Sequence, residues 1–187
     1  MNERMPTETR PETARAPVQR NDARAALAEA DAALARDPGD DSRMLARLRA
    51  LSALDDRSAA ARQAAEIVAT GTVRPAALDP ILAAVLAIDD LRTARNAIAL
   101  AEASGRMPQG ALPRARAQLA IASGDLQAAT AILVAAIEED PQNTTLRAQL
   151  TEALLAGGNA GHARDVLARI GMRPADPVEG RGGAEGG

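Results

Sequence analysis

A chain of 187 residues is long enough for one domain or for one array of small repeats. It carries a net charge of −3 and has no Cys, Phe, Tyr or Trp, which excludes disulfides, thiolate metal sites, cysteine nucleophiles and aromatic base-stacking surfaces for nucleic acid. Alanine supplies about a quarter of the residues and every basic residue is Arg, so we expect an all-α fold. Heavy use of Ala, Arg and Gly without Lys also suggests a bacterial genome rich in G and C.

The chain begins with a segment, residues 1–20, that combines three prolines with Thr, Glu and Arg. Such a segment buries little apolar surface, so we expect a disordered tail. It has no apolar run of the kind that marks a signal peptide. The longest apolar stretch, near Ala83 to Ile88, is too short to span a bilayer. We therefore expect no membrane insertion and a cytoplasmic location.

Residues 21–170 form a train of Ala- and Leu-rich segments broken by short turn signals, among them Asp37-Pro38 and Gly157-Gly158. Glycine ends helices in left-handed geometry, and proline cannot continue one. The predicted elements are a lone helix over residues 22–36 and hairpins near residues 41–70, 76–104, 110–139 and 144–170. Residues 171–187 are rich in Gly and Pro, and we expect a flexible tail there.

Pro80 lies inside the first helix of the hairpin near residues 76–104. Either that helix starts late, with Asp79 as its N-cap and Pro80 at its first position, or it continues through Pro80 with a kink. We prefer the late start, because proline is well tolerated at the first helical position.

Small residues recur along this body at a fixed period. One small residue follows each mid-repeat turn at the same distance. These residues are Ala26, Ala60, Ala94, Ala129 and Ala163, and successive members are 34, 34, 35 and 34 residues apart. The residues four and seven places further on are again Ala, Ile or Leu, so three positions of each repeat share one helical face. The period indicates hairpins that bury this face by packing on one another.

This helix–turn–helix period resembles the tetratricopeptide repeat. The segment from Gly124 to Pro141 carries the family's turn glycine, its small residues Ala129 and Ala136, its large apolar residue Leu133 and its closing proline. The resemblance covers the whole body of the chain, although aliphatic residues stand where the family usually has aromatic ones. It implies an α-solenoid of four hairpins preceded by a single helix.

In this family the first helices of the hairpins line a concave groove that binds peptides or partner domains. The resemblance therefore implies a candidate groove made of Leu45, Arg49, Asp79, Leu86, Arg114, Gln118, Ile121, Glu152 and Leu155. It also implies a non-enzymatic scaffold or adaptor whose partner is a protein or a peptide. An accessory or regulatory subunit of a bacterial envelope, secretion or polysaccharide-assembly system is the alternative, and self-association through the ends of the array is open as well.

Residue types that could do chemistry have simpler explanations within the repeat. His162 is the single histidine and has no second ligand for a metal. The acidic pairs that begin at Asp55 and Asp89 occupy equivalent turns, where the carboxylates are expected to cap the next helix. The segment from Gly157 to Gly161 has neither the strand before it nor the Lys after it that a phosphate loop needs. We expect no enzyme activity, no metal and no cofactor.

A group of arginines in the first hairpin is harder to assign. It comprises Arg43, Arg47, Arg49, Arg57 and Arg62. These residues form either solvated helix faces near neighbouring aspartates or a basic patch for an acidic peptide.

Overall fold

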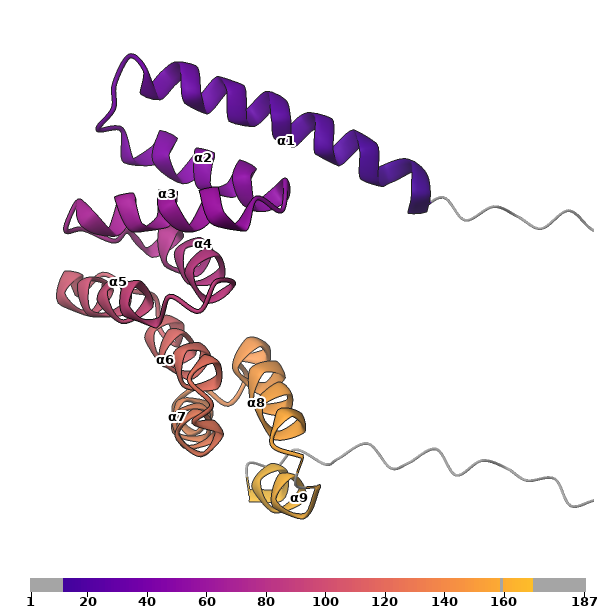
Figure 1. Ribbon diagram of the computed structural model, residues 1–187. Helices are drawn as coiled ribbons and strands as arrows, with labels where there is room; N and C mark the ends of the chain where they lie inside the picture. The colour runs from indigo at the N-terminus through magenta and orange to yellow at the C-terminus, as the bar shows by residue number, and fades with distance from the viewer. Residues whose placement is uncertain (1–11, 159, 170–187) are drawn as a thin grey trace, which may run out of the picture. The chain divides into compact units, whose positions relative to one another are not determined.

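The computed structural model describes residues 12–158 and 160–169, and these residues form helices joined by short turns (Figure 1). The helices are α1 (Glu12–Leu34), α2 (Asp41–Ala53), α3 (Arg57–Ala69), α4 (Pro75–Leu86), α5 (Leu91–Ser104), α6 (Ala111–Ala122), α7 (Leu126–Glu139), α8 (Thr144–Ala156) and α9 (Ala160–Arg169). The predicted all-α helical repeat is confirmed. The predicted tails at residues 1–11 and 171–187 lie outside the described residues.

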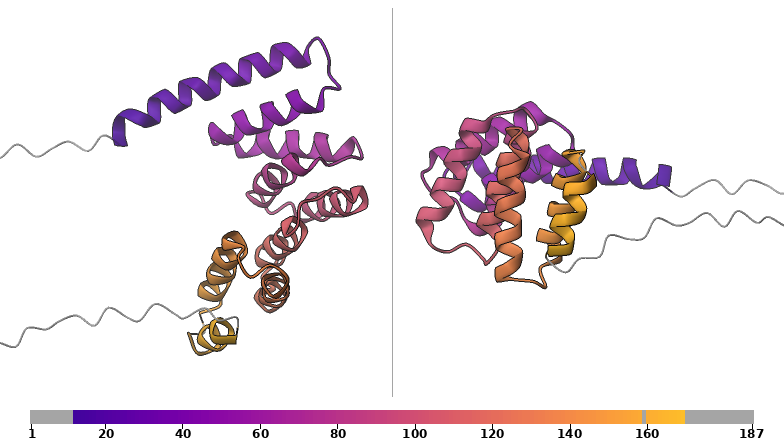
Figure 2. Two further views of the ribbon diagram at one scale, coloured as in Figure 1. Left: turned by 180° about the vertical axis from the view of Figure 1, so that it is seen from behind. Right: turned by 90° about the horizontal axis from the view of Figure 1, so that it is seen from below.

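The chain divides into two compact units, unit 1 over residues 1–115 and unit 2 over residues 116–187, and the boundary falls inside α6. In unit 1, α1 packs on α2, α2 on α3, α3 on α4 and α4 on α5, while α2 also contacts α4 and α3 also contacts α5 (Figure 2). In unit 2, α7 packs on α8 and α8 packs on α9. This is the contact pattern of stacked hairpins, in which each hairpin covers the apolar face of its neighbour.

The core of each unit is aliphatic. In unit 1 the largest fully buried apolar side chains are Leu48, Leu78, Ile81, Leu82 and Val85, which come from α2 and α4. In unit 2, side chains from α6, α7 and α8 form one cluster that contains Ala117, Leu133, Ile137, Leu146 and Leu150. Each fully buried Leu or Ile contributes about 1.5–3 kcal/mol to folding.

The periodic small residues lie at the contacts between helices, with one exception. Ala60, Ala94 and Ala129 are at most 2% exposed, as the period predicted. Ala26 is exposed, and α1 instead buries Ala23 and Ala30. The prediction was wrong for Ala26 because the described chain gives α1 no first helix of its own to pack against. The side chain of Ala163 lies outside the described residues.

The acidic pairs shape the turns inside the hairpins. Asp55 and Asp89 each follow a first helix in the left-handed region, with φ of 58°, and Gly124 takes the equivalent place with φ of 81°. The side chains that accept a backbone N–H at the start of the next helix belong to the residues that follow them, Asp56, Asp90 and Asp125. Their own N–H groups donate to the carbonyl five residues back, as in the bond from Asp56 to Leu51. The expectation that these carboxylates cap helices is confirmed for the second acid of each pair, while the first acid forms the turn.

The late start expected for α4 was wrong. The helix begins at Pro75, Arg74 is its N-cap, and Pro80 lies in its interior. Asp79 is therefore a helical residue and caps nothing. The early start is favoured because Pro75 supplies the preferred first residue and because Ala77 and Leu78, both nearly inaccessible, belong to the extra turn.

The start of the N-terminal helix also differs from the expectation. Helix α1 begins at Glu12 rather than near Asp22, so it extends into the segment for which a disordered tail was predicted. It passes through Pro17, the sixth residue of the helix, which removes one intrahelical hydrogen bond. The Ala, Glu, Gln and Arg residues around Pro17 have high helix propensity, which accounts for the longer helix.

The cap of α5 gives a prediction with a pH dependence. Asp90 accepts the backbone N–H of Thr93 at 3.0 Å and its hydroxyl at 2.6 Å. The hydroxyl bond and then the backbone bond hold the pKa of Asp90 below its ordinary value. Asp90→Ala should lower the free energy of unfolding by about 1 kcal/mol at pH 7. Because the chain has no aromatic residue, far-UV circular dichroism in urea is the measurement.

A group with a depressed folded-state pKa stabilises the fold above its unfolded pKa, and this stability is lost as the pH falls through the folded value. The difference between wild type and Asp90→Ala should therefore persist above about pH 4 and shrink below it. Asp90→Asn is the matched control, because it keeps the acceptor oxygen and removes the titration. An unchanged difference between pH 7 and strongly acid solution would show that the ionised carboxylate contributes nothing.

Candidate partner-binding face

The residues predicted to line a groove lie on the first helices of their hairpins, and we call this surface the first-helix face. In unit 1 it comprises Leu45, Arg49, Asp79, Leu86 and Arg114, and in unit 2 Gln118, Ile121, Glu152 and Leu155. None of these described side chains is buried, and Arg49, Asp79, Glu152 and Leu155 are exposed.

In unit 1 the structure joins two of the predicted residues in an ion pair. Arg114 of α6 donates to the carboxylate of Asp79 of α4, and the two residues occupy the same position of successive repeats. The side chain of Arg114 is 26% exposed and that of Asp79 is 49% exposed. The pair fixes both charged groups on the first-helix face before any partner arrives.

Arg49 makes a different contact with α4. Its guanidinium donates to the backbone carbonyl of Ala76 at 3.3 Å. In a regular α-helix that carbonyl would accept from the N–H four residues later, but the later residue is Pro80, which has none. Arg49 therefore supplies a donor that the proline removes, and it ties α2 to α4.

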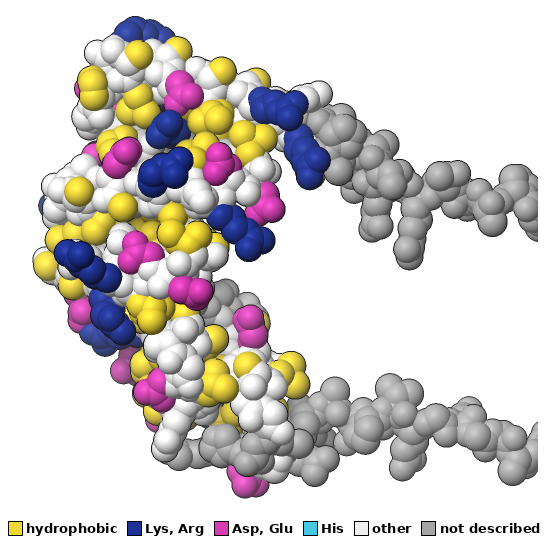
Figure 3. Space-filling model, in the orientation of Figure 1, with side chains coloured by type: hydrophobic (Ala, Val, Ile, Leu, Met, Phe, Trp, Pro, Cys, Tyr) yellow, Lys and Arg dark blue, Asp and Glu magenta, His cyan; other side chains and the backbone are white. Residues whose placement is uncertain are grey.

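Three of the five arginines of the first hairpin form ion pairs, Arg49 donates to a backbone carbonyl, and Arg62 is exposed. Arg47 donates to Asp31 at 2.6 Å and also to the side chain of Gln63. The remaining ion pairs join Arg43 to Glu29 and to Asp40, and Arg57 to Asp55. Figure 3 shows acidic and basic side chains interspersed over this part of unit 1. The interpretation of solvated, paired helix faces is the better one, and the basic-patch interpretation is set aside.

In unit 2 the predicted residues have unequal roles. Ile121 packs against the buried cluster and so contributes to the core. Leu155 is 76% exposed and is the most exposed large apolar side chain of the described residues. Glu152, one turn before it on α8, is exposed as well. The apolar part of this face that a partner can reach is therefore centred on Leu155.

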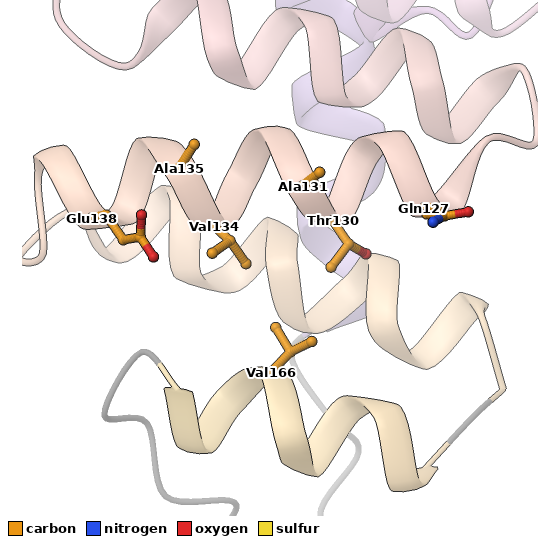
Figure 4. Close-up of a pocket in the computed structure, with 7 residues that line it drawn as sticks. All are labelled: Gln127, Thr130, Ala131, Val134, Ala135, Glu138 and Val166. Carbon is orange, nitrogen blue, oxygen red and sulfur yellow. The ribbon is translucent and has the colours of Figure 1, made fainter.

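Sequence reasoning missed a hollow in each unit. In unit 1 a hollow of about 380 Å3 opens beside the first-helix face and is lined by Ser52, Asp55, Arg57, Ala60, Ala83, Ala84 and Ala87. In unit 2 a hollow of about 320 Å3 lies on the second helices, with α7 supplying Gln127, Thr130, Ala131, Val134, Ala135 and Glu138 and α9 supplying Val166. Val166 points from α9 toward Val134 and Thr130 (Figure 4). Four of the seven residues that line the hollow of unit 1 are alanines, and no single motif in the sequence predicts either hollow.

Residues 12–158 and 160–169 contain no cluster of three His, Asp or Glu side chains that could hold a metal ion. The segment from Gly157 to Gly161 includes the turn between α8 and α9, where Gly158 has φ of 65°. The side chain of His162 lies outside the described residues. No helix in the described part of the chain combines the length and apolar character of a membrane span.

Comparison with protein families gives one match. Residues 120–179 match the model of the tetratricopeptide repeat. Comparison with curated proteins and with solved structures gives no match. The match confirms the predicted family resemblance for residues 120–179, and the bacterial source stays a prediction.

A double-mutant cycle tests the ion pair of unit 1. Asp79→Ala and Arg114→Ala should each lower the free energy of unfolding, and the coupling between them should be about 0.5–1 kcal/mol, since both groups are partly exposed. Urea unfolding of wild type, both single variants and the double variant at low salt gives the four values. The coupling should fall when salt is added. Strictly additive effects would show that the pair does not form in solution.

Proposed function

We propose that this chain, which carries tetratricopeptide repeats, is a binding module that holds a partner protein on its first-helix face. Tetratricopeptide repeats generally mediate protein–protein interaction, and the family is typically non-enzymatic. The specific surface and the kind of partner segment are what the proposal adds.

The hollow beside the first-helix face of unit 1 carries the proposal. Its floor and walls are mainly alanine methyl groups, and Ser52 and the Asp55–Arg57 ion pair lie at its polar side. A volume of about 380 Å3 accommodates one or two apolar side chains of a partner. Leu45 and Leu86, both half-buried on the same face, extend the apolar surface next to it. An apolar helix or extended segment with a few charged residues fits this lining best.

The charged groups of the face support this kind of partner because they are already held in place. Arg114 is fixed by Asp79 and Arg49 by the carbonyl of Ala76. Ordering a free arginine side chain on binding costs about 0.5–1.5 kcal/mol. Prior pairing reduces this cost, so a partner would meet a face that is largely preorganised.

Three further expectations belong to the same proposal. The first is a cytoplasmic location. The second is the alternative role as a subunit of a bacterial envelope, secretion or polysaccharide-assembly system, in which the chain would hold its partner on the same first-helix face. Self-association is the third, since the exposed Leu155 is an apolar group that another copy could cover. The identity of the captured partner separates these roles.

Ala83→Arg is the sharpest test of the face in unit 1. Ala83 is exposed and lines the hollow, so a long charged side chain there should block a partner without disturbing the core. In a crosslinked pull-down from native lysate, the partner recovered with wild type should be lost with Ala83→Arg. The control is Ala99→Arg, the same substitution at an exposed position of α5, which should retain the partner. Arg114→Glu is a poorer choice, because it would also set two carboxylates against each other at Asp79.

Recovery of the same proteins with Ala83→Arg and wild type would show that the first-helix face of unit 1 is the wrong surface. Recovery of nothing except the chain itself would make a homo-oligomer the better explanation.

Leu155→Ser tests the face in unit 2. Because Leu155 is 76% exposed, its replacement should change the free energy of unfolding by less than about 0.5 kcal/mol. Affinity for the captured partner, measured by calorimetry, should nevertheless fall by about tenfold, which corresponds to one lost apolar contact. Ile137→Ser, at a buried position of the same unit, is the control for a variant that does lower the free energy of unfolding. Equal affinity of Leu155→Ser and wild type would remove unit 2 from the binding surface.

A further inference from the structure

A larger hollow lies on another part of unit 1, between the α3–α4 loop and the end of α5. It measures about 560 Å3, and we call it the Arg106 hollow. Its lining consists of Asp41, residues 71–75, Leu100, Ala103, Ser104 and Arg106. None of these residues belongs to the predicted groove, so the hollow is a separate feature of the surface.

The charges in this hollow do not cancel. Arg74 donates to the carboxylate of Asp41 at 3.0 Å, which neutralises one cation. Arg106 is exposed, and the described part of the chain places no carboxylate in an ion pair with it. The lining therefore carries one net positive charge. Because Arg74 is itself 62% exposed, both guanidinium groups remain accessible.

The backbone fixes the place of both arginines. Gly105 ends α5 in the left-handed region with φ of 61°, and the N–H of Arg106 then donates to the hydroxyl of Ser104 at 3.3 Å. Arg74 is the N-cap of α4, and its side chain makes no capping bond. The caps of α2, α3 and α5 are aspartates, whereas the start of α4 presents a cation beside the positive end of its dipole. Asp41 already supplies a negative group at this end, which leaves Arg106 as the cation of the hollow without one.

The other half of the lining is apolar and limits what that group can be. Val73 is 3% exposed, Leu100 is half-buried, and Pro75 and Ala103 complete the apolar side. One uncompensated cation suits one negative charge, whereas a nucleic acid backbone needs several cations. A carboxylate that is followed by an apolar side chain matches both halves, and a guanidinium binds a carboxylate with two parallel hydrogen bonds.

We propose that the Arg106 hollow binds an acidic side chain of the partner protein together with an apolar neighbour in the partner's sequence. This proposal rests on the protein-binding function proposed above and adds a second contact surface in unit 1, which selects partners by charge.

The test uses the full 15N-labelled chain and a short probe, acetyl-Leu-Asp-Leu-amide. In a titration followed by 1H–15N NMR, the amides of Gly71, Thr72 and Arg106 should shift and saturate. Arg106→Gln should weaken binding about tenfold, and added salt should weaken it as well. Arg92→Gln removes an exposed arginine on the first turn of α5 and should leave the affinity unchanged. Arg106 is exposed, so circular dichroism should show the same fold and melting temperature for both variants.

Two further probes separate the alternatives. The uncharged peptide acetyl-Leu-Asn-Leu-amide should bind at least about tenfold more weakly than the Asp peptide. Inorganic phosphate should also bind more weakly than the Asp peptide, because it gains nothing from the apolar half. Equal binding of the Asn peptide, equal or tighter binding of phosphate, or an undiminished affinity of Arg106→Gln would overturn the proposal.

Failure of the proposal for the Arg106 hollow can be distinguished from failure of the proposal for the first-helix face. Ala83→Arg should bind the Asp peptide as wild type does, because Ala83 does not line the Arg106 hollow. If wild type binds no peptide while Ala83→Arg still loses the cellular partner, the Arg106 hollow alone is refuted. If the peptide binds and Ala83→Arg keeps the partner, the first-helix face alone is refuted.

Discussion

Ala60, Ala94 and Ala129 occupy one position of three successive second helices, and each is almost completely buried. A methyl group at this position lets the two helices of a hairpin approach closely, so the backbones themselves supply much of the contact. This closeness matters because the core has no aromatic side chain to fill a wider space. Small side chains that face outward, such as Ala83 and Ala87, leave gaps on the surface. The hollow beside the first-helix face is such a gap. The close packing of the hairpins and the shape of this hollow thus follow from one compositional constraint.

Polar contacts between helices then fix how the hairpins stack in unit 1. The contact from Arg49 to Ala76 replaces a hydrogen bond that Pro80 removes, so the proline costs less than it would in an isolated helix. The Asp31–Arg47–Gln63 network joins α1, α2 and α3 in the same way. Apolar packing on alanine is not directional, whereas these bonds require one alignment of neighbouring helices. These bonds therefore add directional contacts between neighbouring helices of unit 1 to the apolar packing.

Helices whose bounds depend on local signals could be predicted from the sequence. The ends of α2, α3 and α5 fall close to the expected hairpin limits because caps and turn residues lie next to them in the chain. Prediction failed where distant residues decide, as for α4, whose first turn is retained by burial of Leu78 and by the contact from Arg49, 27 residues earlier. The candidate face could be named from the sequence because its positions repeat, and its role in binding stays a prediction. The pairing of Asp79 with Arg114 and the shapes of the hollows depend on which helices meet, and no local pattern encodes that.

The two surfaces proposed for unit 1 differ in whether their charged groups are already paired, so they would recognise a partner by different interactions. On the first-helix face Asp79 and Arg114 already form an ion pair, so a partner's charge would have to compete with that contact. Selectivity there must come mainly from shape and from apolar area beside Leu45 and Leu86. In the Arg106 hollow one cation has no such partner among the described residues, so a partner's carboxylate gains a new charge-assisted bond. A segment that met both surfaces would be held by apolar contacts at one and chosen by charge at the other.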